Sequence, residues 1–443
     1  MKNIFLTIVL FCFSLQLFAQ EGFQFTSNAD KVKVPFKLLN NLIFIPVNVN
    51  GVSMTFLVDT GVEETILFSL EETDTVPFFN VSKVKLRGLG SEESIEALSS
   101  TQNKLVISKK LMDANHSILI ILDQEINLSS SIGITVNGII GYHLFKNKLV
   151  TINYQKQELV IYDNAENNQS KKFRKFESVP ITVENKKPYV LGDFKFKGTD
   201  QHRGKLLLDT GNTDALWLFE NQSEQIKVPK ENFEDYLGRG FSGEIHGKRG
   251  KIQEFALQNF SFKNPYVAFP DSVSIQNVKM VESRVGSVGG ELLKRFTVVF
   301  DYTNEKMYLK KNENYSKPFS FNMSGLEINH AGVQWVPETS KLYTFVTNES
   351  KEAYNVNKEN TIKYNFVLKP IFKIVNVRKD SPAAIAGLQK DDLIVSINNK
   401  LAAYYTLQEI NDLLKSEEGR KIIFELDRKG VTVKRTLTLK NIL

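Results

Sequence analysis

The tripeptide Asp-Thr-Gly occurs twice in this sequence, at residues 59–61 and 209–211. Each copy follows an apolar run, Phe56-Leu57-Val58 in the first case and Leu206-Leu207-Leu208 in the second. A buried strand that ends in these residues presents a carboxylate on a tight turn, because glycine adopts backbone angles that other residues avoid. If two such turns face each other, their carboxylates share a proton and act as base and acid on one water. This is the chemistry of peptide-bond hydrolysis.

The residues that follow the two tripeptides also repeat. Gly138-Ile139-Ile140-Gly141 lies downstream of the first copy, and Gly286-Ser287-Val288-Gly289 lies downstream of the second. The apolar segments 150–154 and 298–302 come next in each half, displaced by 148 positions where the two aspartates are displaced by 150. A repeat of this length predicts two related lobes in one chain.

This arrangement resembles the pepsin and retropepsin aspartic peptidases over roughly residues 30 to 315. Residues 59–65, Asp-Thr-Gly-Val-Glu-Glu-Thr, are similar to the retropepsin sequence Asp-Thr-Gly-Ala-Asp-Asp-Thr. The resemblance implies a mainly β, two-lobed β-barrel fold in which each lobe gives one catalytic aspartate, Asp59 and Asp209. It also implies that a later apolar strand ending in glycine braces each active-site loop.

The resemblance further implies roles for the neighbours of the two aspartates. Thr60 and Thr210 would form hydrogen bonds across the lobe interface, while Gly61 and Gly211 would permit the turns. Hydrolysis would proceed by attack of water, with no cofactor, no metal and no covalent intermediate. The chain departs from the pepsin pattern directly after each glycine, where Val62 and Asn212 replace the usual Ser or Thr. This departure affects the outer hydrogen bonds of the dyad and its pH range.

Two glycine-rich segments are candidates for the flap that closes over a bound peptide in this family. The first contains Gly88, Leu89 and Gly90, and the second contains Gly240 and Phe241. Neither segment has the tyrosine of a pepsin-type flap, and ordinary hairpin tips would have the same composition. Acidic residues near the dyad, Glu63, Glu64 and Asp214, either favour basic substrates or orient the loops.

The N-terminal residues 1–20 are typical of a secretory signal peptide. Lys2 precedes an apolar run, and small residues for cleavage follow near positions 19 and 20. A lipoprotein would need cysteine at the cleavage point, but the single cysteine, Cys12, lies inside the apolar run. We therefore expect a secreted or periplasmic protein without disulfides.

Composition limits the function further. The chain has 443 residues, a formal net charge of +6 and 42% hydrophobic residues, as in ordinary globular proteins. Its lysines are spread among nearly as many acids, which argues against nucleic-acid binding. After the signal peptide no run is apolar enough to be an integral membrane segment. No zinc motif is present, and no segment marks a serine-lysine dyad, although some secreted peptidases combine one with a PDZ domain.

The C-terminal part closely resembles a PDZ domain. Ser381-Pro382 caps a short predicted helix that Gly387 ends, and an apolar strand follows at residues 393–398. A PDZ groove binds a peptide end as an added strand, while loop amides hold its carboxylate. Gly325-Leu326-Glu327-Ile328 is the favoured candidate for this loop, although about forty residues separate it from Ile374. Lys369-Pro370-Ile371-Phe372 is the alternative.

The sequence thus predicts a signal peptide at 1–20, lobes at 21–165 and 172–318, and a PDZ domain at 320–443. The expected protein is an aspartic endopeptidase that acts on peptides or proteins, with a PDZ module that binds C-terminal peptides. Two alternatives remain open. The peptidase domain could be an inactive scaffold that only binds peptides, and the PDZ domain could serve only to pack against the lobes.

Overall fold

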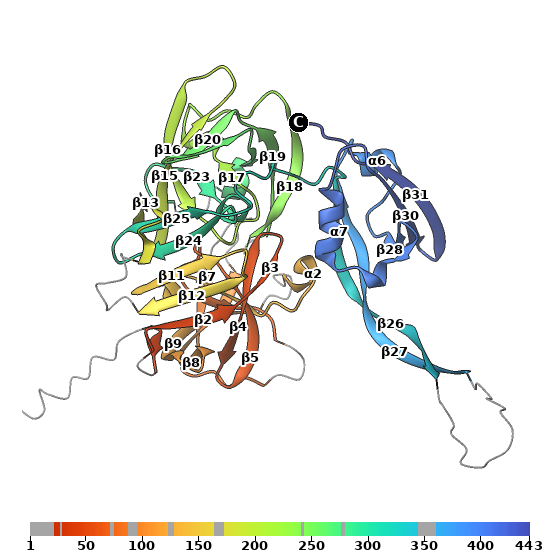
Figure 1. Ribbon diagram of the computed structural model, residues 1–443, viewed down its shortest axis with the longest axis horizontal. Coiled ribbons are helices and arrows are strands. Elements are labelled where there is room, and N and C mark those ends of the chain that lie inside the picture. The colour runs from red at the N-terminus through yellow and green to blue at the C-terminus, as the bar shows by residue number, and fades with distance from the viewer. Residues whose placement is uncertain are drawn as a thin grey trace, which may run out of the picture. The chain divides into compact units, whose positions relative to one another are not determined.

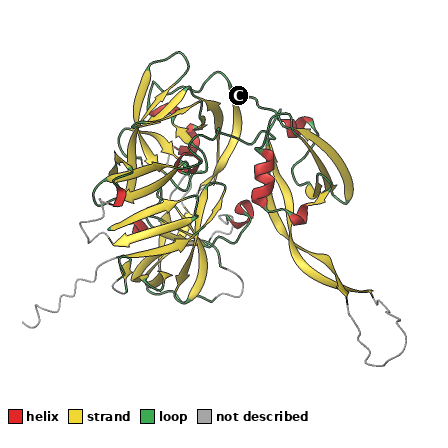
Figure 2. Cartoon of the chain, in the orientation of Figure 1, coloured by secondary structure: helices red, strands yellow, loops and turns green. Residues whose placement is uncertain are grey.

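The computed structural model describes residues 22–26, 29–70, 75–86, 95–122, 128–163, 172–240, 243–275, 280–343 and 360–443. These residues are mainly β-strands with a few short helices (Figure 2). They form two compact units. The first comprises residues 1–127 and 136–319, and the second comprises residues 128–135 and 320–443. The predicted signal peptide lies outside the described residues.

The first lobe is built on a sheet of nine strands: β1 (Gln24–Phe25), β3 (Lys37–Leu39), β4 (Leu42–Val49), β5 (Val52–Val58), β6 (Thr65–Leu67), β7 (Ser82–Leu86), β8 (Ile95–Ser108), β9 (Leu111–Ile121) and β10 (Gly138–Ile140). In β5 and β10 the central residues are buried, as expected from their apolar runs. Strand β10 runs parallel to β5, with Val58 beside Ile140, and antiparallel to β6. Helix α3 (Tyr142–Phe145) follows it directly.

The second lobe repeats this arrangement with ten strands: β14 (Thr182–Glu184), β15 (Lys187–Lys195), β16 (Gln201–Leu208), β17 (Leu216–Leu218), β18 (Asn232–Gly240), β19 (Gly243–Lys251), β20 (Glu254–Leu257), β21 (Phe260–Lys263), β22 (Tyr266–Pro270) and β23 (Arg284–Val288). Strand β23 runs parallel to β16 and antiparallel to β17, as β10 does with β5 and β6. Short helices η3 (Glu220–Gln222) and α4 (Ser272–Ile275) lie between strands, and α5 (Gly290–Leu293) follows β23.

A sheet of six strands joins the two lobes: β2 (Lys31–Pro35), β11 (Lys148–Asn153), β12 (Glu158–Asp163), β13 (Glu177–Pro180), β24 (Phe296–Asp301) and β25 (Lys306–Lys311). The repeated apolar segments of the sequence meet here, because β11 pairs antiparallel with β24 through Thr151 and Val299 (Figure 1). One hydrophobic core continues through both lobes and this sheet. The two lobes therefore form one folding unit.

The C-terminal unit contains a separate sheet made of β26 (Leu326–Tyr343), β27 (Asn360–Val377), β28 (Leu393–Ile397), β29 (Lys400–Leu401), β30 (Lys421–Arg428) and β31 (Val431–Thr438). Its helices are α2 (Ser129–Ile132), α6 (Pro382–Ile385), η4 (Ala402–Tyr404) and α7 (Leu407–Leu414). The Ser381 hydroxyl accepts a hydrogen bond from the Ala384 amide and so caps α6, and Thr406 and Glu409 form a capping box at the start of α7.

A long hairpin explains the forty residues between the two parts of the PDZ motif. Strands β26 and β27 pair antiparallel from Leu326 opposite Val377 out to Tyr343 opposite Asn360. Gly325-Leu326-Glu327-Ile328 therefore lies beside Ile374 in space despite the separation in sequence. The alternative segment, Lys369-Pro370-Ile371-Phe372, lies inside β27 and forms no loop.

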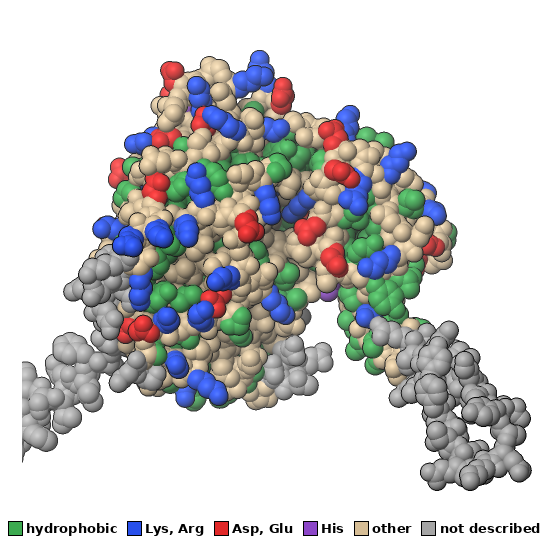
Figure 3. All heavy atoms as spheres, in the orientation of Figure 1, with side chains coloured by type: hydrophobic (Ala, Val, Ile, Leu, Met, Phe, Trp, Pro, Cys, Tyr) green, Lys and Arg blue, Asp and Glu red, His purple; other side chains and the backbone are tan. Residues whose placement is uncertain are grey.

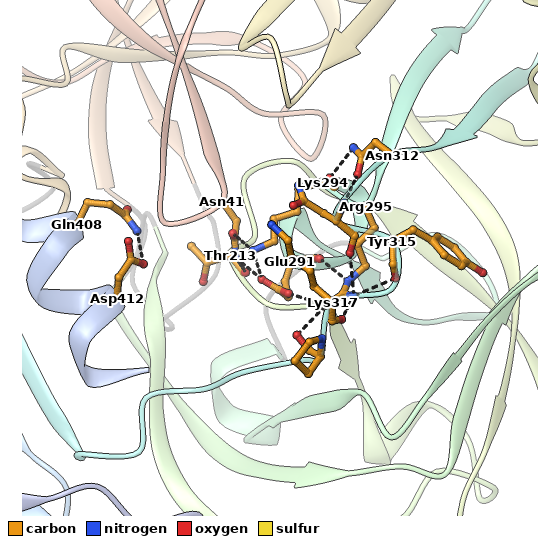
Figure 4. Close-up of polar contacts among 12 residues, drawn as sticks. Asn41, Thr213, Glu291, Lys294, Arg295, Asn312, Tyr315, Lys317, Gln408 and Asp412 are labelled. Carbon is orange, nitrogen blue, oxygen red and sulfur yellow. Dashed lines mark hydrogen bonds and ion pairs between the residues drawn. The ribbon is translucent and has the colours of Figure 1, made fainter. Parts of the chain in front are cut away.

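The chain between β25 and the C-terminal unit is held by a buried arginine. The Arg295 guanidinium donates to the carbonyl oxygens of Asn314, Tyr315, Lys317 and Pro318, and also to the Glu291 carboxylate (Figure 4). Its Cζ lies 3.8 Å from the centre of the Phe319 ring. One side chain thus fixes the segment from Asn314 to Phe319, which leads out of the second lobe.

We expect Arg295→Met to lower the free energy of unfolding of the first unit by about 3–5 kcal/mol, because it leaves the carbonyl oxygens of residues 314–318 without their donor and removes one cation from Glu291, which keeps only Lys294 and Asn41. Urea denaturation of the full chain measures the effect. The matched control is Arg203→Met, since Arg203 pairs with Asp193 on the surface and its side chain is 65% exposed. The control should cost less than about 1 kcal/mol. Equal losses for both variants would contradict the anchoring role of Arg295.

Candidate active site

The two Asp-Thr-Gly turns follow equivalent strands and are supported in the same way. Asp59 follows β5, and its amide donates to the Ile140 carbonyl at 3.0 Å. Asp209 follows β16, and its amide donates to the Val288 carbonyl at 2.9 Å. Gly141 lies so close to the Val62 carbonyl that any side chain there would collide with it. The later apolar strands, β10 and β23, therefore hold the two aspartate loops in place.

Reciprocal hydrogen bonds join the two loops through their threonines. The Thr60 amide donates to Thr210 Oγ1 at 3.1 Å, and the Thr210 amide donates to Thr60 Oγ1 at 3.0 Å. Each hydroxyl also donates across the interface, Thr60 to the Leu208 carbonyl at 2.6 Å and Thr210 to the Val58 carbonyl at 2.8 Å. Both threonines are buried. The position of each loop thus depends directly on the other lobe.

These contacts bring the two aspartates together. Their carboxyl groups share a hydrogen bond. The Gly61 amide donates to Asp59 Oδ1 at 2.7 Å, and the Gly211 amide donates to Asp209 Oδ1 at 3.0 Å. Protein atoms enclose the carboxyl groups, although part of each residue remains accessible to solvent. The structure thus brings together the two aspartates that the sequence singles out, and their catalytic role stays a prediction.

Burial raises the pKa of both aspartates, because a carboxylate is poorly solvated inside the protein. The negative charge of Asp209 raises the pKa of Asp59 further. At Asp209 the buried Arg284 guanidinium opposes the effect of burial, and Lys187 acts more weakly on both residues. A pair in this environment favours one shared proton, with the negative charge on the side of Arg284.

The two departures from the pepsin pattern have visible consequences. Val62 has no side-chain donor, and the Asn212 side chain contacts the Asp214 amide at 2.9 Å and Ser287 Oγ at 3.4 Å. Among the described residues, no hydroxyl donates to the outer oxygen of either aspartate. The dyad is therefore held by the glycine amides and by the mutual hydrogen bond.

The acidic residues beside the dyad are paired with cations. Glu63 contacts Lys187 at 3.0 Å, and Glu64 contacts both Lys186 at 2.5 Å and His143 at 3.1 Å. The hydrogen bond from His143 and the interactions with Lys186 lower the pKa of Glu64 to about 2. Because these acids are neutralised, their arrangement favours the loop-orienting role over attraction of basic substrates.

The second lobe contains an equivalent set of contacts around Asp214, which occupies the position of Glu64. Asp214 accepts from Arg249 at 2.6 Å and from the Trp217 indole at 2.9 Å, and Arg249 also donates to Asp235. Arg249 is buried and lies on β19, so these bonds connect the active-site loop to the β18–β19 hairpin. Glu64 in the first lobe and Asp214 in the second therefore each support the loop that carries the aspartate.

Arg284 is a residue that the sequence analysis missed. It is buried on β23, its Nε donates to the Gly286 carbonyl at 3.1 Å, and its Cζ lies 5.3 Å from the centre of the Phe219 ring. The two halves of the sequence repeat with a displacement of 148 residues, so Arg284 occupies the position that Val136 has in the first lobe. An alignment of the two halves would have shown this exchange of an apolar residue for a cation.

The structure locates the flap candidates only in part. Strands β7 and β8 pair up to Leu86 and Ile95, and Gly88, Leu89 and Gly90 between them lie outside the described residues. Gly240 ends β18 in the second lobe, and Phe241 also lies outside. Both candidates thus fall at hairpin ends, and their role as flaps stays a prediction.

No group of three or more His, Cys, Asp or Glu side chains that could hold a metal ion occurs in the part of the chain that the structure describes. Over the same residues, no helix has the length and apolar character required to cross a membrane.

The proposed carboxylate-binding loop lies in the C-terminal unit, at the start of the edge strand β26 and near α7. Gly325 has a φ of +80°, and a β-carbon there would collide with Ser381. The Leu326 amide donates to Ser324 Oγ at 3.0 Å, so a bound carboxylate would have to replace that hydroxyl. Within the same unit, α2 packs against β26, and Gly133 lies against Leu407 and His330.

Comparison with known proteins identifies a family for part of the C-terminal unit. Residues 373–428 match the PDZ domain family. Among solved structures, the chain is similar to an aspartic proteinase from Irpex lacteus, with 14% identity and a TM-score of 0.40 over 65% of this chain and 99% of that one. No curated protein matches the sequence. The chain thus combines a mainly β, two-lobed unit with a C-terminal unit in which residues 373–428 match the PDZ domain family.

Proposed function

We propose that the two-lobed domain is an aspartic endopeptidase that cleaves peptide or protein substrates. The observation that carries this proposal is the pair of carboxyl groups on equivalent turns, joined by a hydrogen bond and held by reciprocal bonds between Thr60 and Thr210. Two half-buried carboxyl groups that interact directly and share one proton supply a general base and a general acid in one place.

The charges around the dyad indicate which aspartate acts as the general base and which as the general acid. Arg284 favours the negative charge on Asp209, so Asp209 takes a proton from the attacking water while Asp59 gives its proton to the substrate carbonyl oxygen. The tetrahedral product then collapses as Asp209 returns a proton to the leaving nitrogen and Asp59 recovers one from the hydroxyl. The C–N bond breaks, and a carboxylic acid and an amine leave without a covalent intermediate.

A second candidate is an inactive scaffold that binds peptides without cleaving them. It is favoured by the position of Val62 and Asn212, since no hydroxyl supports the outer carboxylate oxygens among the described residues. A peptide that contains statine, which imitates the tetrahedral state, distinguishes the two. A working dyad should bind it at least about a hundredfold more tightly than the matching substrate, and an inactive scaffold should not.

We also propose that the PDZ domain binds the C-terminal end of a peptide or protein, with the edge strand β26 and helix α7 forming the binding surface. The signal-like N-terminus supports a secreted or periplasmic location. A PDZ domain beside a peptidase could recruit proteins through their ends.

Asp59→Asn and Asp209→Asn should each reduce turnover of a peptide library to less than about one hundredth, because the amide cannot transfer the shared proton. Asp200→Asn is the matched control, since Asp200 is exposed in the turn between β15 and β16. Mass spectrometry of the digest measures cleavage. If either dyad variant keeps full turnover, the dyad is misassigned.

The same variants should not lower the thermal unfolding temperature at pH 7. A carboxyl group whose pKa is raised by folding stabilises the protein below its unfolded pKa of about 3.9, and this contribution decreases as pH rises towards the folded value. Asparagine remains neutral throughout, so the unfolding temperature should be equal or higher. Calorimetry of the wild type, the two dyad variants and Asp200→Asn checks that the variants lose activity because proton transfer fails and not because they unfold.

The pH profile should extend well above the ordinary range of aspartate, because the shared proton is lost only as pH rises through the raised pKa of the pair. We expect cleavage to persist at pH 6 and to fall at alkaline pH. A profile that ends near pH 4 would contradict the raised pKa.

Arg284→Met tests the other limb of the profile. Removal of the cation should raise the pKa of Asp209, so the acidic limb moves towards higher pH. Arg203→Met, on the surface, should leave both limbs in place. An unchanged acidic limb in Arg284→Met would show that this arginine does not act on the dyad.

For the PDZ domain, the full chain carrying Asp59→Asn should bind peptides with a free C-terminus more tightly than their amidated forms. A charged hydrogen-bonding partner is worth about 1.5–3 kcal/mol. Fluorescence anisotropy with labelled peptides measures both affinities. Equal affinity for acid and amide would show that the domain recognises internal segments, and no binding across a diverse library would support a purely structural role.

A further inference from the structure

The β26–β27 hairpin extends beyond the sheet of the PDZ domain. Strand β27 pairs with β28 only at Phe372 and Lys373 among the described residues. From Val333 opposite Pro370 outwards, β26 and β27 pair with each other as a two-stranded ribbon. A two-stranded ribbon alone is marginally stable in water, and it needs further strands or a packed apolar face.

One face of this ribbon is apolar and exposed. Trp335 lies opposite Leu368, and Pro337 lies opposite Phe366, with alternate residues on the same face. The exposed fractions are 66% for Trp335, 61% for Phe366 and 53% for Leu368. We call this face the apolar stripe, and its members are Val333, Trp335, Pro337, Phe366, Leu368 and Pro370. Figure 3 shows hydrophobic side chains gathered over this hairpin.

The apolar stripe continues a face that is covered inside the domain. Phe372 and Ile374 lie two and four residues after Pro370 in β27, on the same side of the strand, and both are fully buried. The opposite face of the ribbon carries Gln334 and Lys369, which pair across the strands, and also the half-buried pair Val336 and Val367. The two faces therefore differ in exposure, because the apolar stripe continues a buried face of the domain but is itself exposed to solvent.

We propose that the apolar stripe is a self-association surface, on which a second copy of this chain packs its own ribbon face to face. No member of the stripe is charged, so two copies do not repel each other, and no complementary charge on another partner is required. Two ribbons in contact would form a small two-layered sandwich with the usual spacing of about 10 Å between sheets.

The area is sufficient for such a contact. An aromatic side chain offers about 150–250 Å², and Trp335 and Phe366 each expose more than half of theirs. With the aliphatic and proline residues, the stripe presents on the order of 500 Å², which is large for a free surface. Two copies would bury about 1,000 Å², the lower limit for a specific interface.

Sedimentation velocity of the full chain over a wide concentration range tests this proposal. We expect a dimer that Trp335→Asp weakens at least about 30-fold, which is typical of an aromatic residue at the centre of an interface. Phe366→Thr should also weaken it while keeping a residue that favours strands. Gln334→Asp is the matched control on the opposite face, and its dimer should remain.

Tryptophan fluorescence gives a second readout at the stripe itself. The chain has two tryptophans, and Trp217 is buried. Quenching by acrylamide should therefore report Trp335, and it should decrease with protein concentration in the wild type but not in Phe366→Thr. A wild type that stays monomeric at all concentrations would overturn the proposal. So would a monomer whose Trp335 is protected only by phosphatidylcholine vesicles, because the stripe would then be a membrane contact.

Discussion

The reciprocal hydrogen bonds between Thr60 and Thr210 are the constraint on which the active site depends. Each hydroxyl accepts from the opposite backbone and donates to the carbonyl that precedes the opposite aspartate, so neither loop can move alone. The six-stranded sheet that joins the lobes keeps the two halves in register over a longer distance. Two carboxyl groups are thereby held together in a half-buried site, although electrostatic repulsion between their charged forms would separate them.

The electrostatics of the site are less symmetric than its backbone. Equivalent strands support both aspartates, but Arg284 stands in the second lobe where the first has Val136. The acids that follow the two turns are paired with lysine in one lobe and with Arg249 in the other. A duplicated scaffold can therefore assign different roles to two identical residues, because the pKa of each depends on its surroundings.

The C-terminal domain combines a well-packed core with a hairpin that extends beyond it. Its capped helices and buried strands form an ordinary PDZ core, with Ile374 and Phe372 fully buried. The same strand then leaves the core and carries Leu368 and Phe366 into solvent. Apolar residues on an unsupported ribbon are costly unless another surface covers them. The exposed apolar residues of the hairpin would therefore be stabilised by a second surface that covers them.

The sequence by itself determined the main elements of this protein. Two Asp-Thr-Gly turns, each after an apolar strand and before a bracing strand, can be found from local patterns, and so can the capped helices of the PDZ domain. Only the tertiary structure decided which charges surround the dyad, because Arg284 and Lys187 reach it from distant parts of the chain. It also decided that residues 326–343 pair with residues 360–377 as a long hairpin, since strand pairing depends on contacts that local composition does not encode.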